Sequence, residues 1–404
     1  MRNLLRTSIK LRIFGIILIL LAIMLNPYTL GRYITYDGTI DNPNTIAKLI
    51  FFEIVLFYIG INMILKIWAF HKYNKRVIRF VKFRKNNLLL LGFSLLIGII
   101  LSFALLEIYF YFNENPETQW HRFDSEIGWV PNNGMSFITN GKTVSFNSLG
   151  FRGEEVDSSK QHIILVGDSV TFGYGVNDNE TIDYYLNNKF ENLQTINLGV
   201  TGYGLDQSYI RLKKSIDNLN PKYIIVIIYT GNDFEDTISD TTFSRKSKPL
   251  FILEDGELEL INSDVKENSC INLFSKSWTL NKFLPNFLLD IICNTKTLDI
   301  EDGQLVISSL IDEINSLAIQ HNSTILFVLS PKIDKDGNLA GRHNLFREIL
   351  ESKGYNYLDY YSELNGRNYD IQSLYLDYQH YTPEGNKLFS EIILDSLGET
   401  QPKA

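Results

Sequence analysis

The feature that most narrows the folds open to this chain is the run at residues 163–173. Four apolar residues, from Ile163 to Val166, are followed at once by Gly167, Asp168 and Ser169. A short apolar run bounded by glycine is typical of a strand buried on both faces, as in parallel α/β sheets. Reactive groups of such sheets collect where the strands end. Ser169 is therefore a candidate nucleophile, and the alternative is that Asp168 or Ser169 only caps a helix.

Apolar runs of the same kind recur downstream and alternate with helical segments. Strands are predicted over residues 195–198, 223–229 and 324–329, and helices over 184–190, 205–219, 305–319 and 386–397. This alternation favours a doubly wound parallel sheet, whose strand ends lie side by side. Residues that follow different strands are then expected to meet at one edge of the sheet.

Two further strand ends carry groups that can donate hydrogen bonds. The second strand ends in a glycine-rich stretch with Gly199 and Gly202, and the third ends in Gly231, Asn232 and Asp233. Exposed backbone N–H groups and a neutral side-chain amide are suited to hold a developing oxyanion. Taken singly, the glycines also suit a plain turn, and Asn232 also suits a helix cap.

A serine nucleophile needs a base, and histidine is favoured because it titrates near neutrality. Of the six histidines in the chain, only His380 falls in a loop expected at the strand-end edge. Asp377 precedes it by three residues and can reach around a turn to the imidazole Nδ1. Alone, this pair would more often be a surface turn. It also lacks the partners of a metal site, and no cofactor or metal is predicted.

The four segments together resemble the SGNH/GDSL hydrolase superfamily, over residues 162–397. The resemblance implies a three-layer α/β/α sandwich, flavodoxin-like, with a parallel sheet of about five strands. It implies catalysis by Ser169 and His380 with Asp377, and an oxyanion hole built from the Ser169 N–H, the Gly202 N–H and the Asn232 side chain. Gly199 is the alternative to Gly202. Asp168 and Asp233 are expected to support these groups, and Val170 stands where the family often has leucine.

The first 112 residues are predicted to hold three membrane-spanning helices, at about 11–28, 47–70 and 88–112. Residues 88–106 contain no charged side chain, and such a run approaches the ~30 Å of a bilayer core. The loop after the second span carries seven basic residues and no acidic one: Lys72, Lys75, Arg76, Arg79, Lys82, Arg84 and Lys85. Basic loops stay in the cytoplasm, so three spans place the rest of the chain outside. The spans, with the stretch after them, also resemble a membrane-anchored bacterial subgroup of the family.

The remaining chain divides into a β-rich linker at 113–160, a hydrolase domain at 161–398 and a tail at 399–404. Hairpins are predicted around residues 135–146 and 251–260, the second within an insert at 237–297 that separates the third strand from the next helix. Arg152 either binds an anionic group of a substrate or forms a surface ion pair. Cys270 and Cys293 are either two buried thiols or one disulfide, which needs an oxidising compartment.

The sequence thus predicts an integral membrane serine esterase or deacylase with its catalytic domain on the extracytoplasmic side. Its expected partners are the bilayer and an acylated envelope glycan or lipid. The net charge of −8 argues against nucleic acid. Two alternatives remain: an O-acyltransferase that uses the same triad to modify an envelope polysaccharide, and a non-catalytic glycan-binding module.

Overall fold

The computed structural model divides the chain into two compact units, Met1–Ile108 and Tyr109–Ala404. It describes residues 120–398 except 140, 242–245, 263, 267–269, 271–291 and 368, and scattered helical residues between 15 and 107. The predicted spans at 11–28, 47–70 and 88–112 therefore lie largely outside the described residues. Within the part of the chain that is described, no helix is both long and apolar enough to cross a membrane.

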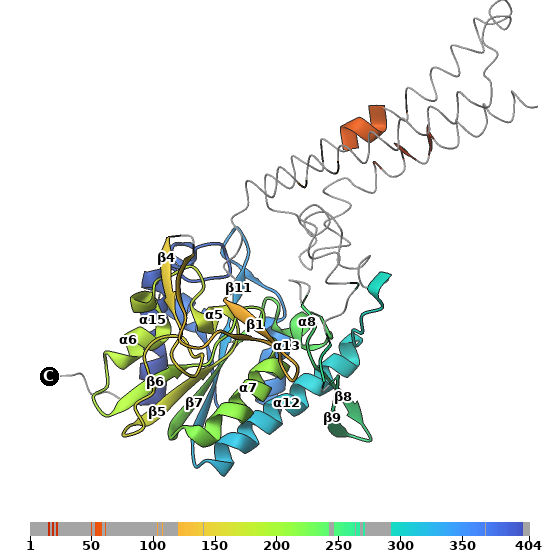
Figure 1. Cartoon of the computed structure of the whole chain (residues 1–404). Helices are drawn as coiled ribbons and strands as arrows, with labels where there is room; N and C mark the ends of the chain where they lie inside the picture. Colours follow the sequence, from red (N-terminus) through yellow and green to blue (C-terminus); the bar gives the residue numbers. More distant parts are fainter. Residues whose placement is uncertain are drawn as a thin grey trace, which may run out of the picture. The chain divides into compact units, whose positions relative to one another are not determined.

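The second unit is built around one parallel sheet of five strands (Figure 1). In spatial order these are β6 (Leu193–Asn197), β5 (Gln161–Val166), β7 (Pro221–Tyr229), β10 (Thr324–Ser330) and β13 (Tyr357–Asp359). Chain order therefore runs 2-1-3-4-5 across the sheet, which is the flavodoxin-like order. The predicted parallel α/β sheet is confirmed, and its topological switch point lies between β5 and β7.

The alternation of side chains along the strands explains the layers on either side of the sheet. Ile164 and Val166 of β5 pack in one core cluster with helices α7 (Leu205–Ser215), α12 (Ile300–Gln320) and α13 (His343–Lys353). Ile163 and Leu165 pack in the other cluster with α6 (Ile182–Asn187), α14 (Tyr360–Gly366) and α15 (Pro383–Leu397). Successive strand residues point to opposite faces, so an uninterrupted apolar run supplies both cores at once. Figure 1 shows the sheet between these two sets of helices.

The helices begin and end where local capping chemistry dictates. They are α5 (Ser169–Phe172), α6 (Ile182–Asn187), α7 (Leu205–Ser215), α8 (Asp233–Thr237), α12 (Ile300–Gln320), α13 (His343–Lys353), α14 (Tyr360–Gly366) and α15 (Pro383–Leu397). Helix α12 starts five residues before its predicted start because the Asp299 side chain accepts a hydrogen bond from the N–H of Asp302 at 2.9 Å. Short 3₁₀ turns lie at Asp178–Glu180, Ile216–Asn218 and Ile371–Leu374.

The segment before the sheet forms two antiparallel hairpins. These are β1 (His121–Asp124) with β2 (Gly128–Pro131), and β3 (Ser136–Thr139) with β4 (Lys142–Ser145), of which the second pair was predicted. Ile127 and Trp129 are buried in the core cluster of α7. Their carbonyls accept hydrogen bonds from the Gln207 side chain and the Tyr203 hydroxyl. This segment and the sheet belong to one compact unit.

The described part of the insert at 237–297 contacts the rest of the unit at several points, including its hairpin and Lys248. Its hairpin, β8 (Leu250–Glu254) with β9 (Glu257–Ile261), turns at Asp255 and Gly256, both with positive φ as the Asp-Gly pattern predicts. Phe251 packs in the core beside α12. Lys248, which is fully buried, forms an ion pair with Asp206 at the start of α7.

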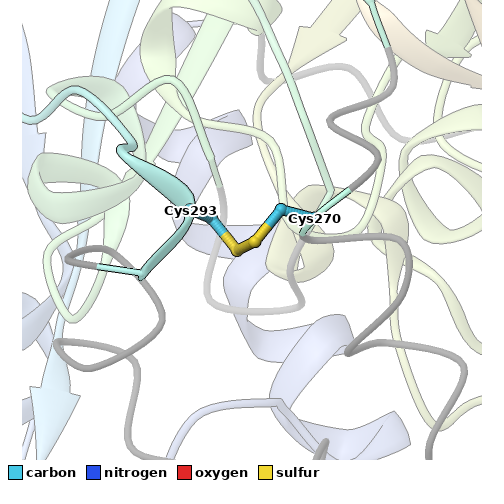
Figure 2. The surroundings of a disulfide bond; sticks show 2 residues. All are labelled: Cys270 and Cys293. Carbon is cyan, nitrogen blue, oxygen red and sulfur yellow. A yellow bond between two sulfur atoms is a disulfide. The ribbon is translucent and has the colours of Figure 1, made fainter.

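The same insert contains the only two cysteines of the chain. Cys270 and Cys293 form a disulfide across 23 residues of sequence (Figure 2). Of the two sequence alternatives, the structure has the bridge. The remaining pair of short strands, β11 (Lys332–Ile333) and β12 (Leu339–Ala340), closes a turn after β10.

Candidate active site

The predicted site residues follow strands that flank the switch point of the sheet. Ser169 comes after β5, Asn232 after its neighbour β7, and Gly202 in the loop after β6 on the other side of β5. At a switch point the loops of adjacent strands diverge to opposite faces and leave room for a ligand. The strand order therefore gathers these residues at one edge of the sheet.

Residues 167–173, here called the serine turn, hold Ser169 at the first position of helix α5. A Cβ at Gly167 would overlap the Thr171 hydroxyl and the carbonyl of Ile227, so only glycine allows this close approach of β5, α5 and β7. The buried Asp168 is the N-cap, and its Oδ1 accepts a hydrogen bond from the N–H of Val170 at 2.9 Å. The helix ends after one turn at Gly173, which has φ +81°.

Arg152 fastens the serine turn from outside. Its Nη1 donates to the carbonyls of Phe172 and Gly173 at 2.7 and 2.5 Å, its Nη2 to Val176 at 2.8 Å, and its Nε lies 3.2 Å from Asp178. Only 3% of Arg152 is exposed. The expected ion pair is therefore present, with Asp178, although the guanidinium is buried and not at the surface. The other expectation, that Arg152 binds an anionic group of a substrate, was wrong, because the guanidinium satisfies the carbonyls that end α5.

Residues 375–381, here called the histidine turn, bring the base to the serine. His380 Nε2 lies 2.9 Å from Ser169 Oγ. His380 Nδ1 lies 2.9 and 3.1 Å from the two carboxylate oxygens of Asp377. The structure thus joins the three predicted residues, Asp377, His380 and Ser169, in one hydrogen-bonded chain.

The histidine turn is closed by its own short-range hydrogen bonds. The N–H of Leu376 donates to the carbonyl of His380 at 2.7 Å, and Asp377 Oδ1 accepts from the backbone N–H groups of Gln379 and His380. Tyr378, which lies between Asp377 and Gln379 in the sequence, has φ +64°. The four other described non-glycine residues with positive φ are aspartate or asparagine, which tolerate this conformation far better than a bulky side chain.

The pKa values of the two carboxylates nearest Ser169 and His380, those of Asp168 and Asp377, are shifted in opposite directions. Partial burial opposes ionisation of Asp377, but the hydrogen bond and charge of His380 outweigh it and lower its pKa below the ordinary value. Burial raises the pKa of Asp168, although the Val170 N–H, His380 and the Ser169 hydroxyl oppose that shift. Asp377 is therefore the carboxylate suited to orient and stabilise a charged imidazole.

Asp233 is the most strongly perturbed acid of the site. Burial, followed by the charge of Asp168, raises its pKa well above the ordinary value. Its Oδ2 accepts a hydrogen bond from the N–H of Tyr229 at 2.8 Å, whereas no described group bonds to its buried Oδ1. Burial and the charge of Asp168 thus both favour the protonated form of Asp233.

The glycine-rich loop distinguishes the two candidate backbone donors. The Gly199 N–H is already used by the side chain of Asn197 at 2.9 Å, and a Cβ at Gly199 would overlap the backbone of Phe172. Gly202 adopts φ +76°, and within the described residues no acceptor takes its N–H. Gly202 can therefore serve as the donor, whereas Gly199 packs against the serine turn.

Asn232 is held by a residue that sequence reasoning did not identify. Its Nδ2 donates to Asp236 Oδ2 at 2.5 Å, one turn further along α8. A carboxylate partner fixes the amide with its NH₂ group toward Asp236 and leaves the second N–H for another acceptor. The four-residue spacing on a helix was the available signal for this pair.

The other described histidines are engaged elsewhere. The His343 Nε2 lies 3.1 Å from Asp359, and His162 Nδ1 accepts the N–H of Asn220. Burial and the nearby Lys246 lower the pKa of His121 to about 2. Among the described histidines, only His380 contacts Ser169.

Comparison with known proteins gives structural similarity only. No family model matches the chain, and no curated protein matches it. A lipase/acylhydrolase from Enterococcus faecalis is 16% identical, with a TM-score of 0.35, and the match covers 60% of this chain and 99% of that one. A member of the lipolytic G-D-S-L family from Veillonella parvula is 14% identical, with a TM-score of 0.35 and coverage of 59% and 99%. A two-domain esterase active on acetylated mannans is 11% identical, with a TM-score of 0.36 and coverage of 61% and 52%.

Proposed function

We propose that this chain is a serine esterase or deacylase of the SGNH/GDSL superfamily. The observation that carries the proposal is the hydrogen-bonded chain from Asp377 through His380 to Ser169. A surface turn needs no serine within 2.9 Å of the imidazole, and a binding module needs no carboxylate behind it. The four motif segments in their family order support the same assignment.

The contacts among Ser169, His380 and Asp377 support a mechanism of acyl transfer. Ser169 Oγ attacks the ester carbonyl while His380 Nε2 takes its proton, and Asp377 stabilises the imidazolium. The oxyanion accepts hydrogen bonds from the Ser169 N–H, the Gly202 N–H and the second N–H of Asn232. His380 then gives its proton to the departing alcohol. Water attacks the acyl-enzyme in the same way and releases the acid.

The proposal extends to where the enzyme works and on what. Three apolar segments with a basic loop between the second and third support a catalytic unit outside the cytoplasm. The Cys270–Cys293 disulfide supports the same side, because such bridges persist in oxidising compartments. The substrate is then an acylated glycan or lipid of the cell envelope.

The test is hydrolysis of p-nitrophenyl acetate by the full-length chain in detergent. Ser169→Ala is expected to lower kcat at least roughly 10⁴-fold, since the nucleophile is lost. Ser158→Ala, which changes an exposed serine of the same unit, is the matched control and keeps full activity. Asn232→Ala is expected to lower kcat roughly 10²–10³-fold.

A labelled fluorophosphonate distinguishes the remaining outcomes. Labelling of Ser169 with acetyl transfer to an added sugar, but without hydrolysis, would replace the esterase by an acyltransferase that uses the same triad. Equal activity in Ser169→Ala, or no labelling and no activity in the wild type, would contradict the proposal.

A further inference from the structure

Three large exposed side chains lie on or directly beside the two turns that bring Ser169 and His380 together. Tyr174 is 38% exposed, Leu376 is 48% exposed and Tyr378 is 49% exposed. Tyr174 directly follows the serine turn, and the other two belong to the histidine turn. We call these three residues, two tyrosines and a leucine, the aromatic rim. Adjacent exposed apolar side chains are more often binding surfaces than accidents of sequence.

Tyr174 contacts both Ser169 and His380, and Leu376 lies against the backbone next to Tyr174. The N–H of Tyr174 donates to the carbonyl of Ser169 at 3.0 Å, and the Tyr174 ring lies 4.7 Å from the His380 imidazole, between centroids. A Cβ placed on Gly175 would lie 2.8 Å from Leu376 Cδ1, so Leu376 covers the backbone next to Tyr174. The two turns thus meet through their rim residues as well as through the Ser169–His380 contact.

Tyr378 occupies a position where a side chain is unfavourable for the backbone. Its φ of +64° is left-handed, and that conformation is strained for a residue with a Cβ. Glycine or asparagine would form the same turn with less strain. The ring is also half exposed, so it gains little from burial. Strain of this kind clusters at ligand-binding sites.

We propose that the aromatic rim is a subsite for the pyranose ring of the sugar that carries the ester. This inference rests on the proposed esterase function and narrows its substrate to an O-acylated glycan. A pyranose has a face of C–H groups that packs on an aromatic ring, while its hydroxyls stay in water at the edges. Tyrosine matches this with an apolar face and a polar tip.

The openness of the rim favours a sugar over a long acyl chain. A fatty chain needs a groove or cavity that removes most of its carbons from water, whereas all three rim residues are more than a third exposed. A cavity of about 290 Å³ lies instead among β1, β2 and α7, lined by residues such as Ile127, Phe151 and Arg211, and includes neither catalytic nor rim residues. A ring lying flat on an open rim keeps its hydroxyls hydrated.

The experiment compares two acetate esters that differ in the alcohol. The full-length chain is assayed with methyl 6-O-acetyl-glucopyranoside and with ethyl acetate, and the ratio of their kcat/KM values is the readout. The wild type is expected to favour the pyranoside at least about tenfold. Tyr174→Ala is expected to remove about tenfold of that ratio, whereas Tyr174→Phe and Tyr174→Trp, which keep the ring, retain it within about twofold.

The matched control is Tyr184→Ala, because Tyr184 on α6 is also 38% exposed and should leave the ratio unchanged. A wild type without preference for the pyranoside, or an equal loss in Tyr184→Ala, would overturn the inference. So would a ratio of ethyl octanoate to ethyl acetate that collapses in Tyr174→Ala, since the rim would then bind an acyl chain. Loss of p-nitrophenyl acetate hydrolysis and of fluorophosphonate labelling in the wild type would instead remove the proposed function itself.

Discussion

The serine turn and the histidine turn meet at one hydrogen bond, but they are held in place differently. In the serine turn, Asp168, Val170 and Phe172 are buried, and Arg152 binds its carbonyls from a separate hairpin segment. In the histidine turn, Tyr375 and Tyr381 are buried and form hydrogen bonds with Pro331 and Ser330 after and at the end of β10. Half of the Asp377 side chain is exposed, however, and the hydrogen bonds at Asp377 and His380 come from within the turn. The proposed nucleophile is therefore enclosed by the fold, whereas the segment between Tyr375 and Tyr381 that carries the proposed base is held mainly by local hydrogen bonds.

Asp168 and Asp377, the aspartates nearest Ser169 and His380, accordingly have different roles. Asp168 caps a helix in a buried setting that raises its pKa, and Asp377 sits at the surface with its pKa lowered, against the effect of partial burial, by the bond to His380. A change in the histidine turn should mainly affect chemistry. A change in the contacts that hold the serine turn should mainly affect stability. The predictions below test that division, from the largest expected effect to the smallest.

Asp377→Asn should have the largest effect, and it should fall on activity. The amide cannot stabilise the imidazolium and favours the wrong imidazole tautomer, so kcat for p-nitrophenyl acetate should fall roughly 10³–10⁴-fold. The loss of stability should be smaller than in Arg152→Met below, because the side chain is half exposed. Asp370→Asn, at an exposed carboxylate just before the turn, is the control. A fall of less than tenfold would mean that Asp377 does not orient the base.

Arg152→Met should have the opposite outcome, with its main effect on stability. Removing a buried cation that satisfies three carbonyls should lower the free energy of unfolding by about 3–5 kcal/mol. Thermal denaturation of the full-length chain, followed by near-ultraviolet circular dichroism, measures this. Arg152→Lys should restore little of the lost free energy of unfolding, because an ammonium group cannot reproduce the planar fork of guanidinium donors.

Arg367→Met provides the matched control for that measurement. Arg367 forms ion pairs with Glu363 and Asp395, but all three side chains are more than a third exposed. Exposed pairs of this kind contribute about 0–1 kcal/mol. Equal losses in Arg152→Met and Arg367→Met would show that the serine turn does not depend on its buried clamp.

Asp233→Asn should change how stability depends on pH. The folded-state pKa of Asp233 is raised above the unfolded value of 3.8 by burial and by Asp168. As pH rises above that unfolded value, the unfolded chain releases this proton first, so the wild type loses stability. Asparagine removes the effect, and the variant should gain in melting temperature relative to the wild type between pH 4 and pH 8.

Asp377 should show the reverse dependence. Its folded pKa is lowered, so its contribution is present above the unfolded value and is lost as pH falls through the folded value, below about pH 4. Melting curves of both asparagine variants at the same pH values compare the two carboxylates directly. Parallel curves for Asp233→Asn and the wild type would contradict a protonated, buried Asp233.

The residues proposed for catalysis could be predicted from the sequence, whereas much of what holds them in place could not. Ser169, Gly202 and Asn232 follow apolar strands, and a parallel sheet brings strand ends together whatever lies between them. Arg152 was misassigned because its partners are backbone carbonyls of a turn about 20 residues later, which leave no pattern in side-chain types. The support of Asn232 by Asp236 was missed although its helical spacing was visible.

The positive φ of Tyr378 could not be predicted from the sequence, because a tyrosine rarely adopts this conformation. The last prediction, which has the smallest expected effect, tests this conformation. Tyr378→Gly and Tyr378→Ala remove the same ring and differ only in the Cβ. At φ +64° the Cβ is strained, so the glycine variant should be about 1 kcal/mol more stable than the alanine variant. At Gln379, the next residue, alanine should instead be more stable than glycine by about 0.4–1 kcal/mol, since glycine adds freedom to the unfolded chain. If alanine equals glycine at position 378, the turn relaxes without the ring. The conformation that lets Asp377 reach His380 would then depend on the Tyr378 side chain. The hydrogen bonds within the turn would not be enough to hold His380 in place.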